Sequence, residues 1–232
     1  MREKIYTIPV NEAFENSEGC PLCDLYKKLE DTEIDLITGA SMMEPDIRIK
    51  TNELGFCRNH FDIMLTFGKR LPVALTIQSH LDSIRKDILP GGLFSKDDAS
   101  KPVKRIEKLC NDCYVCQRIE RHFSAMLETA CILFERESEF RNRFSSQKYF
   151  CLPHYSRLLT VSRNINSKKY HSLLVKSAGE VVERYINSLY DDVSLFCKKF
   201  DYNSKDLPWG NAKDSPERAI DFLKSVEKSR LT

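Results

Sequence analysis

Apolar residues recur at steps of three and four along three long stretches of the chain. Such steps place the apolar side chains on one face of an α-helix and predict that this face is buried. No stretch shows a comparable alternation with a period of two, so we expect an all-α fold. In chain order the three sets are Leu71, Ala74, Ile77, Leu81, Ile84 and Ile88; Ile119, Phe123, Met126, Ala130 and Leu133; and Leu174, Ala178, Val181, Tyr185, Leu189, Val193, Phe196 and Phe200.

Two short motifs alternate along the chain, Cys-x-x-Cys at 20–23 and 113–116, and Cys-x-x-His at 57–60 and 151–154. The first motif is shifted by 93 residues between its copies and the second by 94. Each Cys-x-x-His has an aromatic residue on either side, as in GFCRNHF and YFCLPHY, and follows an acidic-apolar-Arg triplet, DIR or EFR. A nearly constant shift with shared flanks predicts an internal duplication.

Each copy of the duplication is expected to contain a CxxC, a helix, a loop, a CxxH that starts a short helix, and a long helix. This order predicts two pseudo-repeated helical units packed through the long helices. The expected domains are a first repeat over 1–90, a linker over 91–109, a second repeat over 110–200 and a C-terminal tail over 201–232. In the tail, Ser215 as an N-cap before Pro216 predicts a short final helix. We expect Trp209 to hold the tail against the body.

The composition is that of a globular chain with nearly balanced charge. Of its 232 residues 41% are hydrophobic and 30% charged, and the net charge of +2 gives no strong attraction to nucleic acid or an anionic membrane. The most apolar run, LPVALTI, is too short to span a bilayer, and the first ten residues contain no apolar stretch typical of a signal peptide. We therefore expect a cytoplasmic location, where nine cysteines indicate metal ligation or redox chemistry instead of disulfides.

The donor types and their spacing favour zinc. Structural zinc is bound by four Cys or His ligands in a tetrahedron, and residues three apart at a helix start can direct two donors to one point. A long gap between the pairs is tolerated because loop-closure entropy grows only logarithmically with length. We expect two structural sites, each formed within one repeat: Cys20, Cys23, Cys57 and His60 in the first, and Cys113, Cys116, Cys151 and His154 in the second.

Other interpretations of these residues stay open at this stage. The cysteines and histidines could be ordinary members of a helical core, in which free cysteine is commonly buried. Burial does not explain the shared spacing, however. Iron–sulfur ligation favours four thiolates or short spacings that are absent here, and thiol redox chemistry is a further alternative. Iron in place of zinc also stays open as the bound metal.

The remaining cysteines and histidines have no counterpart in the other repeat. Cys110 precedes the second CxxC in CNDCYVC, but the repeat register favours Cys113 with Cys116 and leaves Cys110 as a spare thiol. Cys131 and Cys197 fall on apolar helical faces, where core packing is expected. The three remaining histidines are interpreted as ordinary helix residues: His80, His122 and His171.

Several segments together resemble one family along nearly the whole chain. They are EKIYTIPVNEAF, CPLC, MMEPDIRI, GFCRNHF, the second CxxC with FCLPHY, and PWG with RAI near the end. The chain is similar to an uncharacterised bacterial family, domain of unknown function 6062, which has no established activity. Some members carry an ABC-transporter label, which this sequence does not support because it contains no GxxxxGK[ST] phosphate loop.

For function, we expect a non-enzymatic interaction or scaffold module with protein partners. A thiol redox or metal-handling protein is the first alternative, although the βαβ context usual for a redox CxxC is missing. A nucleic-acid-binding module is the second, based only on the short basic runs KPVKRIEK and RNRF. A hydrolase has the least support, since no matching Ser or His motif is present. The sequence does not specify the oligomeric state.

Overall fold

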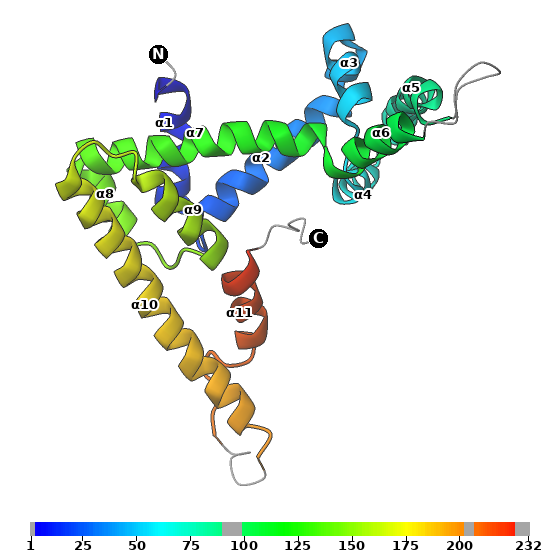
Figure 1. Cartoon of the computed structure of the whole chain (residues 1–232). Helices are drawn as coiled ribbons and strands as arrows, with labels where there is room; N and C mark the ends of the chain where they lie inside the picture. The colour runs from blue at the N-terminus through cyan, green and yellow to red at the C-terminus, as the bar shows by residue number, and fades with distance from the viewer. Residues whose placement is uncertain (1–2, 90–98, 202–206, 226–232) are drawn as a thin grey trace. The chain divides into compact units, whose positions relative to one another are not determined.

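The structure, a computed structural model, describes residues 3–89, 99–201 and 207–225, and these contain helices and no strand. The all-α prediction is therefore confirmed (Figure 1). The eleven α-helices of the described residues are α1 Glu3–Asn16, α2 Pro21–Ile37, α3 Pro45–Leu54, α4 Arg58–Thr66, α5 Arg70–Ile88, α6 Ser100–Asn111, α7 Tyr114–Arg136, α8 Ser138–Ser145, α9 Leu152–Ser162, α10 Lys168–Lys198 and α11 Ser215–Lys224. A 3-10 helix, η1, spans Ala40–Met43.

The chain divides into two compact units. Unit 1 consists of Met1–Lys27 and Phe123–Thr232, and unit 2 of Lys28–His122, so the boundary falls inside α2 and inside α7. Each unit thus contains parts of both sequence repeats. Of the linker expected over 91–109, the first part lies outside the described residues and the remainder forms most of α6.

The core of unit 1 is a cluster of buried phenylalanines. Phe14 of α1 lies 4.9 Å from Phe140 and 5.7 Å from Phe144 of α8, measured between ring centroids. Phe144 in turn lies 5.0 Å from Phe150 and 4.9 Å from Phe134. Centroid distances of about 4.5–7 Å are typical of favourable aromatic pairs. These contacts fix the segment that leads into the second CxxH.

The predicted apolar faces of α7 and α10 are largely confirmed. All five predicted positions of α7 are buried, and so are the first five of α10, from Leu174 to Leu189. The end of α10 differs, since Phe200, beyond its last residue, is 75% exposed. Cys131 on α7 is buried as expected. Cys197 is exposed, so the core position predicted for it is wrong.

The tail packs on α10 within unit 1. The Trp209 ring lies 5.8 Å from Phe196, and the Lys199 ammonium lies over it at 5.2 Å, so Trp209 does hold the tail. Helix α11 begins at Ser215, one residue earlier than expected, and lies beside α10 (Figure 1).

In unit 2, helix α5 packs against α3, α4 and α6. The apolar face predicted for α5 is wrong in part: Leu71, near the start of the helix, is 69% exposed and Leu81 56%, whereas Val73 and Thr76 are buried. Helix α5 therefore packs on its neighbours with a different face from the one that the apolar spacing indicates. The predicted face is left partly exposed in unit 2.

Candidate metal centres

All four Cys motifs lie at helix N-termini and have the same local geometry. The first residue of each motif directly precedes a helix, and the second is the third residue of that helix. The helices are α2 and α7 for the CxxC motifs and α4 and α9 for the CxxH motifs. The N-cap and third positions of a helix approach each other as in a capping box, and the N-terminal dipole stabilises thiolates.

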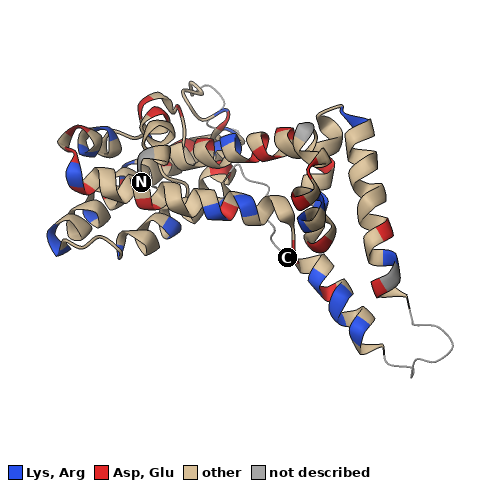
Figure 2. Ribbon diagram, turned by 90° about the horizontal axis from the view of Figure 1, so that it is seen from above, with Lys and Arg blue, Asp and Glu red and all other residues tan. Residues whose placement is uncertain are grey.

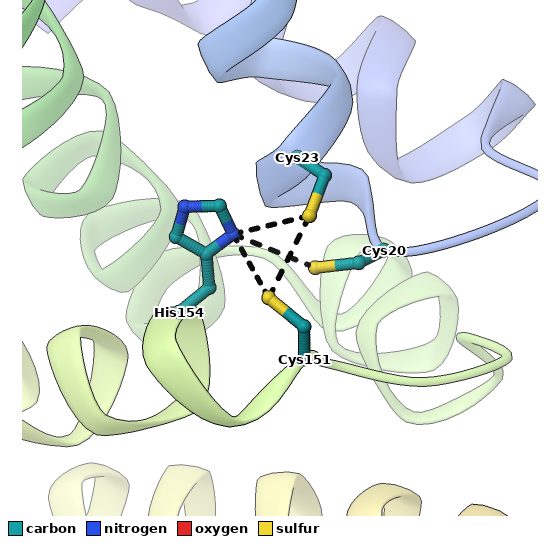
Figure 3. Close-up of side chains that lie close together, drawn as sticks. All are labelled: Cys20, Cys23, Cys151 and His154. Carbon is teal, nitrogen blue, oxygen red and sulfur yellow. Dashed lines mark hydrogen bonds between the residues drawn. The ribbon is translucent and has the colours of Figure 1, made fainter. Parts of the chain in front are cut away.

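Site 1 joins the first CxxC to the second CxxH inside unit 1 (Figure 3). Nδ1 of His154 lies 3.2 Å from Cys151 Sγ, 3.4 Å from Cys23 Sγ and 3.8 Å from Cys20 Sγ. The sulfurs of Cys23 and Cys151 are 3.6 Å apart. Tetrahedral zinc with bonds of about 2.0–2.3 Å separates its donors by roughly 3.3–3.8 Å, and these four distances lie in or next to that range. All four side chains are buried.

Site 2 joins the first CxxH to the second CxxC inside unit 2. Nδ1 of His60 lies 3.2 Å from the sulfurs of Cys57 and Cys113, and 3.3 Å from that of Cys116. The sulfurs of Cys57 and Cys116 are 4.0 Å apart. His60 and Cys113 are buried, whereas Cys57 and Cys116 are partly exposed.

The eight predicted residues thus form two Cys₃His clusters, but the predicted grouping is wrong. Each CxxC meets the CxxH of the other repeat. Loop-closure entropy describes a flexible chain, whereas a helix directly follows the first cysteine of each CxxC. Helix α2, with 17 residues, is about 25 Å long, and α7, with 23, about 35 Å. Each helix starts at its CxxC and carries the chain away from that motif before the next CxxH is reached.

Three contacts around the clusters are not predictable from the motifs. At site 2, Oε1 of Glu30 lies 3.1 Å from Nε2 of His60, which fixes the ring and leaves Nδ1 toward the sulfurs. The amide of Tyr114 donates to the carbonyl of Gly55 at 2.9 Å and joins the segments that carry the two motifs. At site 1, the hydroxyl of Ser225 lies 3.3 Å from Cys23 Sγ.

A glycine at position 55 is needed for the close approach of the two segments that carry the motifs of site 2. Its φ of 63° is in the left-handed region, where it ends α3 and turns the chain toward Cys57. A Cβ at this position would lie 3.1 Å from Nε2 of His80. Residues other than glycine would therefore strain the turn that positions the CxxH of site 2.

The electrostatics of both clusters call for a cation. Burial raises the pKa of Cys20, whereas hydrogen bonds with Cys151 and Cys20 lower the pKa of Cys23. At site 2, hydrogen bonds with Cys113 and Cys116 lower the pKa of Cys57, and those with Cys113 and Cys57 raise that of Cys116. In each cluster, therefore, the pKa of one thiol is lowered while that of a neighbouring thiol is raised. Three adjacent thiolates require a divalent ion to offset their charge.

The donor sets fit a structural metal ion. Three sulfurs and one imidazole nitrogen per cluster satisfy a four-coordinate tetrahedral site, with no position left for substrate. Cys110 belongs to neither cluster, and the structure groups Cys113 and Cys116 at site 2, as the repeat register favours. Among the described residues, His80, His122 and His171 are also outside the clusters, and all nine cysteines are free thiols.

Comparison with known proteins identifies the family without giving an activity. Residues 1–230 match a family of unknown function, DUF6062, and the chain belongs to it. Searches of curated proteins and of solved structures found no match. Nowhere in the described parts of the chain is a helix both long and apolar enough to cross a membrane.

Proposed function

We propose that the protein is a non-enzymatic interaction module whose helices are held together by two structural zinc ions. The observation that carries this proposal is the closed donor set of each cluster. A catalytic zinc keeps one position open for water or substrate, and three sulfurs with one imidazole leave none.

Each ion would join two helix N-termini that are distant in the sequence. At site 1 these are the starts of α2 and α9, and at site 2 those of α4 and α7. Metal binding in small zinc peptides is worth roughly 10–16 kcal/mol and is coupled to folding. The gain here would be smaller for unit 1, which has its own phenylalanine core, and larger for unit 2.

A protein partner is supported by apolar side chains on the surface of unit 2. Met43 and Ile49 are each about two-thirds exposed, and Leu71 and Leu81 are exposed on α5. Exposed large apolar side chains that gather on one part of a surface are typical of protein-interaction sites. Free thiols at every cysteine support a reducing compartment, and we propose the cytoplasm.

The two alternative functions, nucleic-acid binding and thiol chemistry or metal handling, differ in their support. Lys and Arg are interspersed with Asp and Glu over many helices (Figure 2), unlike the continuous basic surface of a nucleic-acid-binding protein. In the basic run KPVKRIEK, Arg105 donates to the Glu53 carbonyl and Lys108 pairs with the Glu53 carboxylate. Thiol chemistry or metal handling is favoured by one observation only, the partial exposure of Cys57 and Cys116.

Elemental analysis of the purified protein tests the zinc proposal. It should give two zinc ions per chain, and removing them with a chelator should lower the helical signal in circular dichroism. Protein with full helicity and no metal would contradict the proposal. For the interaction, Leu71→Glu should abolish partner capture without changing zinc content, whereas Asp82→Asn on the same helix should leave capture unchanged. Equal capture by both variants would exclude the α5 surface.

A further inference from the structure

The two sites share donors and helix geometry but differ in how they are covered. At site 1 all four side chains are buried, Ser225 contacts Cys23, and the site is closed from solvent. At site 2 only His60 and Cys113 are buried. Two cysteines of site 2, Cys57 and Cys116, are therefore open to solvent in part, and none of site 1 is.

The two accessible sulfurs of site 2 belong to different helix ends and are neighbours. Cys57 precedes α4, and Cys116 lies in the first turn of α7, with 4.0 Å between their sulfurs. A disulfide bond is about 2.05 Å long, so the sulfurs must approach by about 2 Å to form one. Both sulfurs would bind the same ion, so loss of that ion removes what holds the two sulfurs apart.

We propose that site 2 is a modification site at which a peroxide oxidises Cys57 and Cys116 to a disulfide and releases the zinc, while site 1 keeps its ion. The inference rests on the proposed function, because it requires that both sites hold structural zinc. It adds a chemical difference between the sites that their identical motifs do not predict.

The step is balanced by the peroxide alone. One thiolate attacks a peroxide oxygen, the O–O bond breaks, and a sulfenic acid and hydroxide form. The second thiolate attacks the sulfenic sulfur, which forms the S–S bond and expels a second hydroxide. The two thiolates lose two electrons, the peroxide accepts them, and both hydroxides take up protons from the buffer and become water. Cys113 and His60 are then too few to hold zinc.

The consequence for unit 2 follows from its small core. Its helix α6 has no buried residue, and α3 and α4 bury one and two. Large apolar side chains such as Leu71 and Ile49 are exposed. A unit with so little apolar burial depends strongly on its metal, so release of zinc from site 2 should loosen unit 2 and leave the phenylalanine core of unit 1 intact.

The test uses the full zinc-loaded chain with Cys110→Ser and Cys197→Ser, which removes the two exposed thiols outside the clusters. Zinc is first measured by elemental analysis, and fewer than two ions per chain would contradict the proposed function itself. Hydrogen peroxide is then added, released zinc is followed with a colorimetric chelator, and disulfides are mapped by peptide mass spectrometry.

We expect release of one of the two ions, a Cys57–Cys116 disulfide, and recovery of the site after a dithiol reductant and zinc are added. Two ions at the start followed by release of both at one rate would overturn the inference alone. So would a disulfide between any other pair, or no release. As a matched control, Cys57→Ser should hold one ion, which the same peroxide treatment leaves bound.

Discussion

Cys23 Sγ lies 3.6 Å from Cys151 Sγ, although 128 residues separate them in the chain. The contact joins the CxxC of the first repeat to the CxxH of the second. The reciprocal contact is Cys113 with His60, 3.2 Å from sulfur to Nδ1. The duplicated motifs have therefore exchanged partners, so that each four-residue cluster draws on both repeats.

Glu30→Gln should weaken zinc at site 2 and leave site 1 unchanged. The carboxylate accepts from Nε2 of His60 and directs Nδ1 toward the sulfurs. Losing such a partner typically costs about 10–100-fold in metal affinity. Competition with a chelator of known affinity measures it. Asp31→Asn, at an exposed position on the same helix, is the control, and an equal loss in both variants would exclude the orienting role.

Alkylation of the native protein should distinguish the exposed cysteines from the buried ones. Cys110 and Cys197 are exposed and should react with iodoacetamide, whereas Cys131 should not. Burial raises the pKa of Cys131 to about 12, so the thiol is almost entirely neutral between pH 7 and 9. Because the thiolate is the reactive form, raising the pH from 7 to 9 should still leave it unmodified. Peptide mass spectrometry gives the answer, and fast labelling of native Cys131 would contradict the structure.

Cys110→Ser should change neither zinc content nor stability beyond about 0.5 kcal/mol, the range of an ordinary surface substitution. The thiol is exposed at the end of α6 and belongs to neither cluster. Zinc content and melting temperature, compared with those of Cys116→Ser, test this. Loss of an ion in Cys110→Ser but not in Cys116→Ser would show that the wrong cysteine is placed in site 2.

Phe144→Ala should destabilise unit 1 by about 3–5 kcal/mol, because the ring is fully buried against Phe14, Phe134 and Phe150. Urea unfolding followed by circular dichroism measures the loss. Phe200→Ala is the matched control, since that ring is 75% exposed and should change stability by about 0.5 kcal/mol or less. Similar losses in the two variants would contradict the assignment of the core.

The sequence predicts most helices and the residues of the two clusters well because both depend on local spacing. The apolar period locates α7 and α10, and the CxxC and CxxH motifs identify all eight cluster residues. Prediction from the sequence fails where several helices pack against the same helix. On α5, Leu71 and Leu81 match the period but are exposed, because the packing of α3, α4 and α6 selects the face with Val73.

The pairing of the motifs could not be predicted from spacing. The two groupings contain the same residue types, and each makes two Cys₃His sites. What decides between them is where rigid helices lead the chain, which the intervals between motifs do not encode. Glu30 and Ser225 were missed for the same reason, since neither lies in a motif and each meets its site only in the folded chain.

The exchange of partners is tested most directly by zinc content in two double variants. Cys57→Ser with Cys113→Ser removes two ligands of site 2 and should leave one ion per chain, held by site 1. Cys23→Ser with Cys57→Ser removes one ligand from each site and should leave none tightly bound after dialysis against a chelator. The opposite result, no ion in the first variant and one in the second, would contradict the exchange and show that each site forms within one repeat.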